Sequence, residues 1–197
     1  ILEGLRTWTG HKAFQRSKRE PGQVILTSRF VAKWKRVERQ DGSTARIIIM
    51  RLVLRGFEDY FAFERDNYSG TAPRQTQRLI NSETACRPSW ILVTIDVEKA
   101  FLQGLTTEEV AECTGEEREV THFTLPPGAA AVLRLIKGFE TYDEHREVLL
   151  ALKAATGTKG APRALSLKRS RTTRSPPLNL RPISRDPELE VGHDEKG

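Results

Sequence analysis

The sequence has 197 residues, with 32 Lys and Arg against 26 Asp and Glu, which gives a formal net charge of +6. Its two cysteines, Cys86 and Cys113, exclude a disulfide framework and offer no paired thiols for zinc. No apolar run reaches the roughly 18 residues of a membrane-spanning helix. We therefore expect an intracellular protein, cytoplasmic or nuclear and not secreted, and the start at Ile1 favours a piece of a longer reading frame.

Positive charge is concentrated at the beginning of the chain. Residues 1–56 hold 13 Lys and Arg against 4 Asp and Glu, a local net charge of +9, whereas residues 57–168 hold 13 against 17. A basic third beside a mildly acidic middle predicts a surface that meets a polyanion such as nucleic acid. The alternative is a solvated basic face without a partner.

Two segments in the basic part predict a β-hairpin. Arg29–Val37 reads RFVAKWKRV and Arg46–Leu54 reads RIIIMRLVL, and both are rich in residues that strands favour. Asp41-Gly42, in the polar stretch between them, is a turn signal. Residues 1–27 show no comparable pattern, and we expect them to be irregular.

Alternation within the first of these strands divides its side chains into two sets. Lys33 and Lys35 belong to a basic outer face, and Phe30 and Trp34 belong to the opposite face. Because aromatic residues at this spacing usually face a core, we expect a half-buried strand. The alternative is that the two rings stack on nucleic-acid bases.

The middle of the chain predicts two helices on either side of a buried strand. The first helix runs from about Arg74 to about Arg87, with Leu79 and Ile80 on its buried side. Trp90–Ile95 (WILVTI) is a short, uninterrupted apolar run, as in strands that are buried on both faces. Residues 97–103 then have a composition compatible with a second helix.

Two further helices are expected later in the chain. Thr106–Glu109 has the spacing of a capping box, which marks the beginning of a helix. Asp143 to about Ala155 predicts a helix with Val148, Leu149 and Leu152 on its inner face.

A change of composition follows at Arg169. Residues 169–197 are rich in Ser, Thr, Arg and Pro and poor in apolar residues. Such a segment cannot bury enough apolar surface to offset its ordering entropy, so we expect a disordered tail. The folded domain is then expected to span residues 28–168.

Asp96 is the residue whose position in the sequence most clearly suggests a catalytic role. It directly follows the apolar run, where a carboxylate is costly unless it is solvated, paired or bound to a metal ion. A carboxylate at a strand end can hold Mg²⁺ for phosphoryl transfer, and Phe101 can then pack beneath the sugar of an incoming nucleotide. The alternative is that Asp96 caps a helix and Phe101 belongs to the core.

Three stretches, in this order, resemble the reverse transcriptase domain of copia-type (pseudoviral) long-terminal-repeat retrotransposons. RLVLRGF at Arg51–Phe57 is similar to the basic fingers strand of that family. TAPRQTQRL from Thr71, followed by TIDVEKAFLQG from Thr94, resembles the F-A-P segment and the L-D-V-x-x-A-F-L-N-G motif. PPG at Pro126–Gly128 precedes LKAATGTKGAPRAL from Leu152, which is similar to L-x-x-A-L-Y-G-L-K-Q-A-P-R-A-W.

The resemblance implies a role for each residue that matches a family motif. Asp96 is implied to be the catalytic, first metal-binding aspartate, and the carbonyl oxygen of Val97 is implied to assist the metal. Phe101 matches the aromatic steric gate that rejects a ribose 2′-hydroxyl. The implied nucleotide-binding residues are Arg51, Arg55, Phe101, Gly157 and Lys159, and the implied nucleic-acid-binding residues are Lys33, Lys35 and Arg163.

The resemblance also implies a fold and an activity. The fold class is α+β: part of a right-hand polymerase, with the fingers hairpin and an incomplete palm over residues 28–168. The implied activity is RNA-directed DNA polymerisation with Mg²⁺, which uses an RNA or DNA primer–template and deoxynucleoside triphosphates. The implied neighbours are the integrase and RNase H domains of a parent Pol polyprotein, with no membrane partner.

One motif of the family is missing from the sequence. No two aspartates are adjacent anywhere in the chain, so the Tyr-x-Asp-Asp motif is absent. We therefore expect the chain alone to be catalytically incomplete and to hold Mg²⁺ weakly or not at all. The alternatives are a non-catalytic remnant that binds nucleic acid without sequence preference, and a relic that folds poorly.

Overall fold

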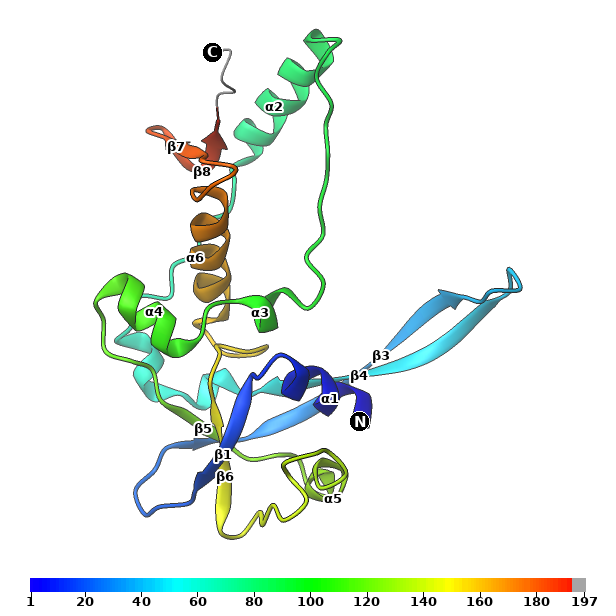
Figure 1. Ribbon diagram of the computed structural model, residues 1–197, viewed down its shortest axis with the longest axis vertical. Coiled ribbons are helices and arrows are strands. Elements are labelled where there is room, and N and C mark those ends of the chain that lie inside the picture. The colour runs from blue at the N-terminus through cyan, green and yellow to red at the C-terminus, as the bar shows by residue number, and fades with distance from the viewer. Residues whose placement is uncertain (193–197) are drawn as a thin grey trace.

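The computed structural model describes residues 1–192, which form a mixed α+β fold (Figure 1). Its helices are α1 (Leu2–Gly10), α2 (Arg74–Cys86), α3 (Ala100–Gln103), α4 (Thr107–Thr114), α5 (Ala129–Leu133) and α6 (Ala161–Thr173), with the 3₁₀ turns η1 (Gly56–Glu58) and η2 (Tyr60–Phe63). Its strands are β1 (Phe14–Lys18), β2 (Ile25–Leu26), β3 (Ser28–Glu38), β4 (Thr44–Leu54), β5 (Thr121–Phe123), β6 (Glu147–Ala151), β7 (Arg181–Ile183) and β8 (Asp186–Val191). None of the described helices combines the length and the apolar character needed to cross a membrane.

A small mixed sheet forms the centre of the molecule, with the strand order β1-β6-β5-β2. Strand β6 is antiparallel to both β1 and β5, so that Ala151 lies opposite Phe14 on one side and Thr121 on the other. Strand β2 pairs with β5 in the parallel direction. Segments about 130 residues apart in the sequence therefore meet in this sheet.

Three aromatic rings form the centre of the core. The ring centroids of Phe14 and Phe123 are 5.7 Å apart in an edge-to-face arrangement, and Trp8 lies 6.2 Å and 6.0 Å from them. Because Trp8 belongs to α1, these contacts pack the helix against the sheet. The surrounding buried residues include Leu5, Leu26, Leu52, Leu54, Leu133, Tyr142 and Leu149.

The first residues of the chain are not irregular, as the sequence had led us to expect. Residues 1–27 form α1, β1 and β2, and they supply Trp8 and Phe14 to the core. The physical reason is tertiary: β1 is a short strand of mixed polarity that is ordered by its pairing with β6.

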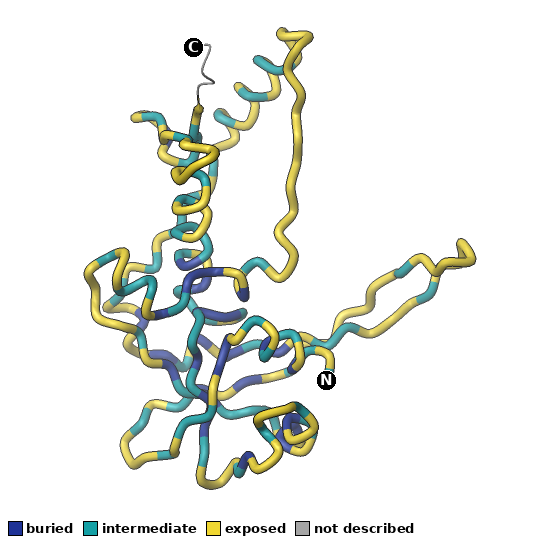
Figure 2. Tube along the Cα trace, viewed as in Figure 1, coloured by how far each residue is buried: buried dark blue, intermediate teal, exposed yellow. Residues whose placement is uncertain are grey.

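The expected β-hairpin is confirmed, as β3 and β4 pair with each other over their full lengths. Its inner end is anchored because Leu52 and Leu54 are buried. Its outer part extends away from the body of the molecule, where most of its residues are exposed (Figures 1 and 2). The expectation of a half-buried strand thus holds only at the inner end. We call β3, β4 and their connecting loop the arm.

The apolar run Trp90–Ile95 does not form the expected buried strand. It connects α2 to α3 as an extended segment, the long exposed trace at the right of α2 and α6 in Figures 1 and 2. Ile91 and Ile95 are each 85% exposed. None of the described strands pairs with the backbone of this run, and no layer covers its apolar side chains, which remain in solvent.

Helix α2 itself begins and ends close to the expected residues, but it has no buried face. Leu79 is more than half exposed and Ile80 is only partly buried, because the helix stands apart from the central sheet (Figure 1). The expected short helix α3 is present. The capping box is also confirmed, since the Thr106 hydroxyl accepts from the Glu109 amide and the Glu109 carboxylate accepts from the Thr106 amide.

The expected helix from Asp143 to about Ala155 is instead strand β6. Val148 and Leu149 are fully buried, as expected for the inner face, whereas Leu152 is only partly buried. A strand is favoured here because β1 and β5 satisfy the backbone of residues 147–151 from both sides.

The expected disordered tail is ordered as far as Val191. Helix α6 continues to Thr173, and β7 and β8 form a second hairpin. Polar contacts connect this segment internally and to α2: Arg174 pairs with Glu190 at 2.7 Å, Arg169 pairs with Glu188, and the Thr76 hydroxyl donates to Asp186. The remainder of the expected tail, residues 193–197, lies outside the described residues.

Candidate nucleic-acid interface

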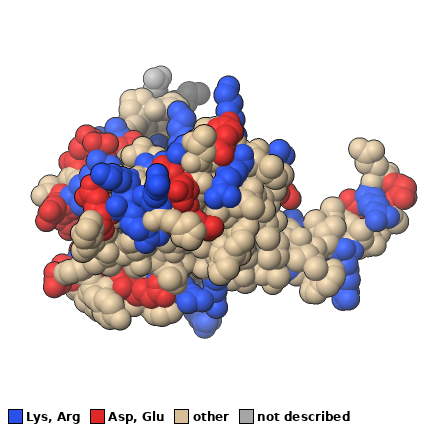
Figure 3. All heavy atoms as spheres, turned by 90° about the horizontal axis from the view of Figure 1, so that it is seen from below, with Lys and Arg blue, Asp and Glu red and all other residues tan. Residues whose placement is uncertain are grey.

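One face of the arm carries only basic and apolar side chains. The register pairs Val31 with Arg51, Lys33 with Ile49 and Lys35 with Ile47, so these side chains share a face. Four cations lie on this surface, which we call the basic face: Arg29, Lys33, Lys35 and Arg51. All four are exposed. Figure 3 shows the arm protruding from the body with basic side chains spaced along it.

The acidic residues of the arm lie elsewhere. Glu38 belongs to the opposite face and pairs with Thr44, and Asp41 lies in the loop. Hydrogen bonds from the hydroxyl and the amide of Ser43 hold the pKa of Asp41 below its ordinary value. Within residues 1–192, no cation of the basic face forms an ion pair, so their charge is available to an external anion.

The opposite surface of the arm, which we call the aromatic face, carries Phe30 and Trp34. Phe30, near the body, packs partly against the core, as expected. Trp34, further out, is 64% exposed and lies opposite Ile48, which corrects its expected place in a core. The next pair outward on this face is Arg36 opposite Arg46.

The inner end of the arm meets the segment that contains Gly157. The amide of Leu54 donates to the carbonyl oxygen of Thr156 at 3.0 Å, and the amide of Gly56 donates to that of Gly157 at 3.1 Å. Two of the stretches that carry the family resemblance, about 100 residues apart, are thus joined through their backbones.

Arg55 and Lys159, both expected to bind a nucleotide, have partners within the chain. Arg55 lies 3.7 Å from Glu58, measured from Nη1 to Oε1, and remains partly exposed. The ammonium of Lys159 lies 3.4 Å from the centroid of the Phe63 ring, in a cation–π contact. Despite these partners, Arg55 is exposed and Lys159 is only partly buried.

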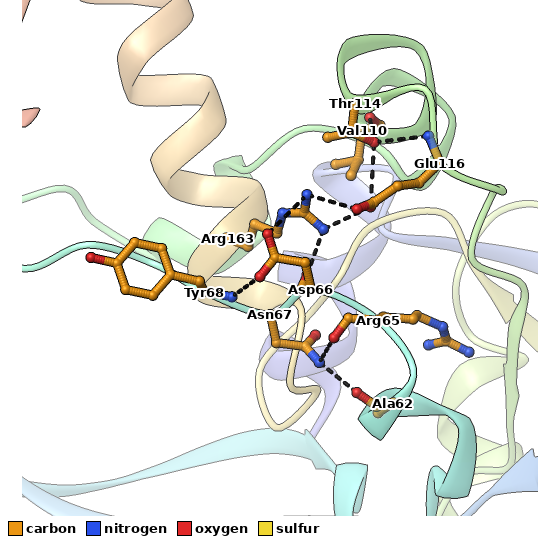
Figure 4. A network of polar contacts seen from close by, with 9 residues as sticks. All are labelled: Ala62, Arg65, Asp66, Asn67, Tyr68, Val110, Thr114, Glu116 and Arg163. Atoms are coloured by element: carbon orange, nitrogen blue, oxygen red, sulfur yellow. Dashed lines mark hydrogen bonds and ion pairs between the residues drawn. The ribbon is translucent and has the colours of Figure 1, made fainter.

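Arg163 occupies the centre of a polar network (Figure 4). Its guanidinium donates to both carboxylate oxygens of Glu116, at 2.7 and 3.1 Å, and lies 3.4 Å from the carboxylate of Asp66. The hydrogen bond from Arg163 holds the pKa of Glu116 below its ordinary value. Through these contacts Arg163 connects α6 to two loops. Because its side chain is only 14% exposed, a phosphate would have to displace Glu116 to reach it.

A cavity of about 550 Å³ adjoins this network. It lies between α4, the start of α6 and two loops, and its lining includes Arg65, Thr107, Glu116, Glu119 and Arg163. None of its lining residues belongs to the arm or to the segment that contains Asp96. The cavity is therefore separate from the basic face.

Asp96 and Val97 lie in the exposed segment between α2 and α3, and Phe101 lies in α3 with about a third of its surface exposed. Among residues 1–192, no three His, Cys, Asp or Glu side chains converge on a common point. Mg²⁺ prefers octahedral oxygen ligands and gives up water reluctantly, and two-metal transfer needs carboxylates on both sides of the ions. Asp96 thus belongs to no group of three or more such side chains among the described residues.

The structure thus brings some of the expected site residues together and leaves others apart. Lys33, Lys35 and Arg51 share the basic face, and Arg55 adjoins Gly157 through the backbone of Gly56. The residues that sequence reasoning missed are Arg29, Arg36 and Arg46. The sequence shows that these arginines belong to the two strand-like stretches. The face on which each side chain of the two strands lies relative to the other strand depends on the register of the hairpin.

Comparisons with known proteins give no relative. No family model, no curated protein and no solved structure matches the chain.

Proposed function

We propose that this chain is part of a copia-type reverse transcriptase and that its arm binds nucleic acid through the phosphate backbone, without sequence preference. The observation that carries the proposal is the basic face, where four exposed cations share one side of a protruding hairpin with no acidic side chain among them. Such contacts release the counterions condensed on nucleic acid, and they contribute affinity without reading bases.

The contact between the arm and the Gly157 segment supports the link to a polymerase. In the proposed protein, the fingers strand at Arg51–Phe57 and the stretch from Leu152 must cooperate around one substrate. The hydrogen bonds of Leu54 and Gly56 to residues 156 and 157 place these stretches side by side. Binding of a deoxynucleoside triphosphate by Arg51, Arg55, Phe101, Gly157 and Lys159 belongs to the same proposal.

The isolation of Asp96 favours the non-catalytic form of this proposal. Two-metal transfer needs several carboxylates, and among residues 1–192 Asp96 belongs to no cluster of three or more ligating side chains, so Mg²⁺-dependent polymerisation is not part of what we propose for this chain alone. We propose that the chain contributes nucleic-acid binding, and that any catalysis in the parent polyprotein depends on further carboxylates.

The test is the salt dependence of binding to a fluorescein-labelled RNA–DNA hybrid, followed by anisotropy over a range of NaCl concentrations. The test variant replaces Arg29, Lys33, Lys35 and Arg51 with Ala. If each cation contacts one phosphate, the slope of log K against log salt becomes shallower by about 3.6, taking about 0.9 per phosphate. The matched control replaces four exposed cations outside the arm with Ala: Arg6, Arg74, Arg78 and Lys137.

The control separates a local effect from a change in total charge, because both variants lose the same formal charge. A slope that changes only in the arm variant supports the proposal. Equal slopes in the wild type and the arm variant, or no binding of the hybrid by the wild type, would refute it.

A further inference from the structure

Trp34 is positioned in a way that packing does not explain. Its side chain is 64% exposed, although it lies in the middle of a strand that is paired along its whole length. Its cross-strand partner, Ile48, is itself 53% exposed and leaves most of the Trp34 side chain in solvent. An indole on a paired strand with a free ring surface is suited to stacking against a planar ligand.

The next pair on the same face places two positive charges side by side. Arg36 and Arg46 are directly opposite each other, and like charges in this arrangement destabilise a hairpin. Glu38 belongs to the next pair outward on this face, two residues along the strand, and within the described residues it forms no ion pair with either arginine. An anion between the two guanidinium groups would relieve their repulsion.

The ring and the charge pair are separated by two residues along each strand, or about 6.8 Å. We infer that this outer part of the aromatic face binds a nucleotide of single-stranded nucleic acid, with its base stacked on Trp34 and a phosphate between Arg36 and Arg46. The inference rests on the proposed function, since it names the form of nucleic acid that the same arm prefers. A duplex cannot offer this contact, because its bases are already stacked and paired.

The distribution of charge favours nucleic acid over a lipid surface. Cations lie on both faces of the arm, and the exposed apolar residues are also divided between the faces, with Trp34 and Ile48 on one and Ile47 on the other. A membrane would need one continuous apolar side to enter the bilayer boundary. A flexible single strand can contact both faces in turn.

The experiment compares a fluorescein-labelled oligo(dT) with a blunt DNA duplex of the same length. We expect Trp34→Ala to weaken oligo(dT) binding at least about fivefold and to change duplex binding less than about twofold. Trp34→Phe keeps a stacking ring and should restore most of the affinity. Trp90→Ala removes an exposed tryptophan outside the arm and should leave both affinities unchanged.

Tryptophan emission gives a second, direct readout. In a Trp90→Phe background, oligo(dT) should quench the emission, and a further Trp34→Phe change should remove the quenching. The double variant Arg36→Gln with Arg46→Gln should weaken oligo(dT) binding as well. Equal weakening of oligo(dT) and duplex binding by Trp34→Ala, or no weakening of either, overturns the stacking site.

The outcomes distinguish this inference from the proposed function. If the wild type binds neither oligo(dT) nor duplex, the proposed function fails and the inference fails with it. If salt-dependent duplex binding requires the basic face but Trp34→Ala leaves oligo(dT) binding intact, only the stacking site is overturned. Binding to phosphatidylserine vesicles that is lost in Trp34→Ala, without oligo(dT) binding, would assign this face to a membrane and also overturn the inference.

Discussion

Gly56 and Gly157 touch through their backbones. The amide of Gly56 donates to the carbonyl oxygen of Gly157 at 3.1 Å, and a Cβ atom added to Gly56 would lie 2.2 Å from that oxygen. Gly157 itself has a φ of +100°, and its own Cβ would lie 2.1 Å from the carbonyl oxygen of Leu54. Side chains are therefore excluded from both positions, and the junction between the arm and the body depends on two glycines.

Alanine at Gly157 should consequently destabilise the protein. The substitution combines a strained φ with a backbone clash, and we expect the free energy of unfolding to fall by about 1–3 kcal/mol or more. Urea denaturation followed by circular dichroism measures the change. Gly22→Ala is the matched control, because Gly22 also has a positive φ but has open space around it. A loss no larger than that of Gly22→Ala would show that the close contact is unimportant.

The fold was predictable where the residues of a segment alone determine its secondary structure. The arm has two strand-like stretches with a turn between them, and the capping box at Thr106 and Glu109 is defined by residues three apart. Strand β6 is different, because the short apolar run from Val148 suits a helix or a strand. Its conformation is decided by β1 and β5, which are distant in the sequence and cannot be read from the run itself.

The ion pair between Arg16 and Glu147 should make stability depend on pH. Arg16 in β1 donates from Nε and Nη2 to the two carboxylate oxygens of Glu147 in β6, both at 2.9 Å. This hydrogen bonding holds the pKa of Glu147 below its ordinary value of 4.5. A carboxylate whose pKa is lower in the folded state stabilises the protein above its unfolded pKa, and this contribution is lost as the pH falls through the folded value.

We therefore expect the stability of the wild type to fall more steeply than that of Glu147→Gln as the pH is lowered from about 5 to about 3. Thermal unfolding at a series of pH values measures the difference. Glu144→Gln is the control, because Glu144 makes no ion pair among the described residues. Parallel pH profiles for the wild type and Glu147→Gln would contradict the expectation.

The exposed run Trp90–Ile95 should be the first site of proteolysis. Its side chains lie in solvent, and it belongs to none of the helices and strands of residues 1–192, so its backbone can enter a protease cleft without prior unfolding. Thermolysin cuts before large apolar residues, and we expect its first cut between residues 90 and 95, as identified by mass spectrometry. An earlier cut within residues 169–191 would instead show that α6 and the β7–β8 hairpin open more readily.

The faces of the arm show why the candidate site could be predicted only in part. A two-residue turn at Asp41-Gly42 would have placed Arg36 opposite Ile47, and Arg46 would then have shared the basic face. In the structure, the amide of Gly42 donates to the carbonyl oxygen of Arg39, and the longer loop shifts the register by one residue. Arg36 then lies opposite Arg46. The composition of the arm indicated its charge, but the loop decided its distribution.

Primer extension tests the catalytic side of the proposal, and we expect this chain to give none. Two-metal phosphoryl transfer stabilises the attacking and leaving oxygens together, which requires carboxylates on both sides of the ions. Asp96 is exposed, and within residues 1–192 it belongs to no cluster of three or more groups that could hold a metal ion. The assay uses a labelled primer on RNA and DNA templates with Mg²⁺ or Mn²⁺, and an active reverse transcriptase serves as the positive control. Incorporation of deoxynucleotides that disappears in Asp96→Asn would contradict this expectation, because it would require a second carboxylate to reach Asp96 in solution.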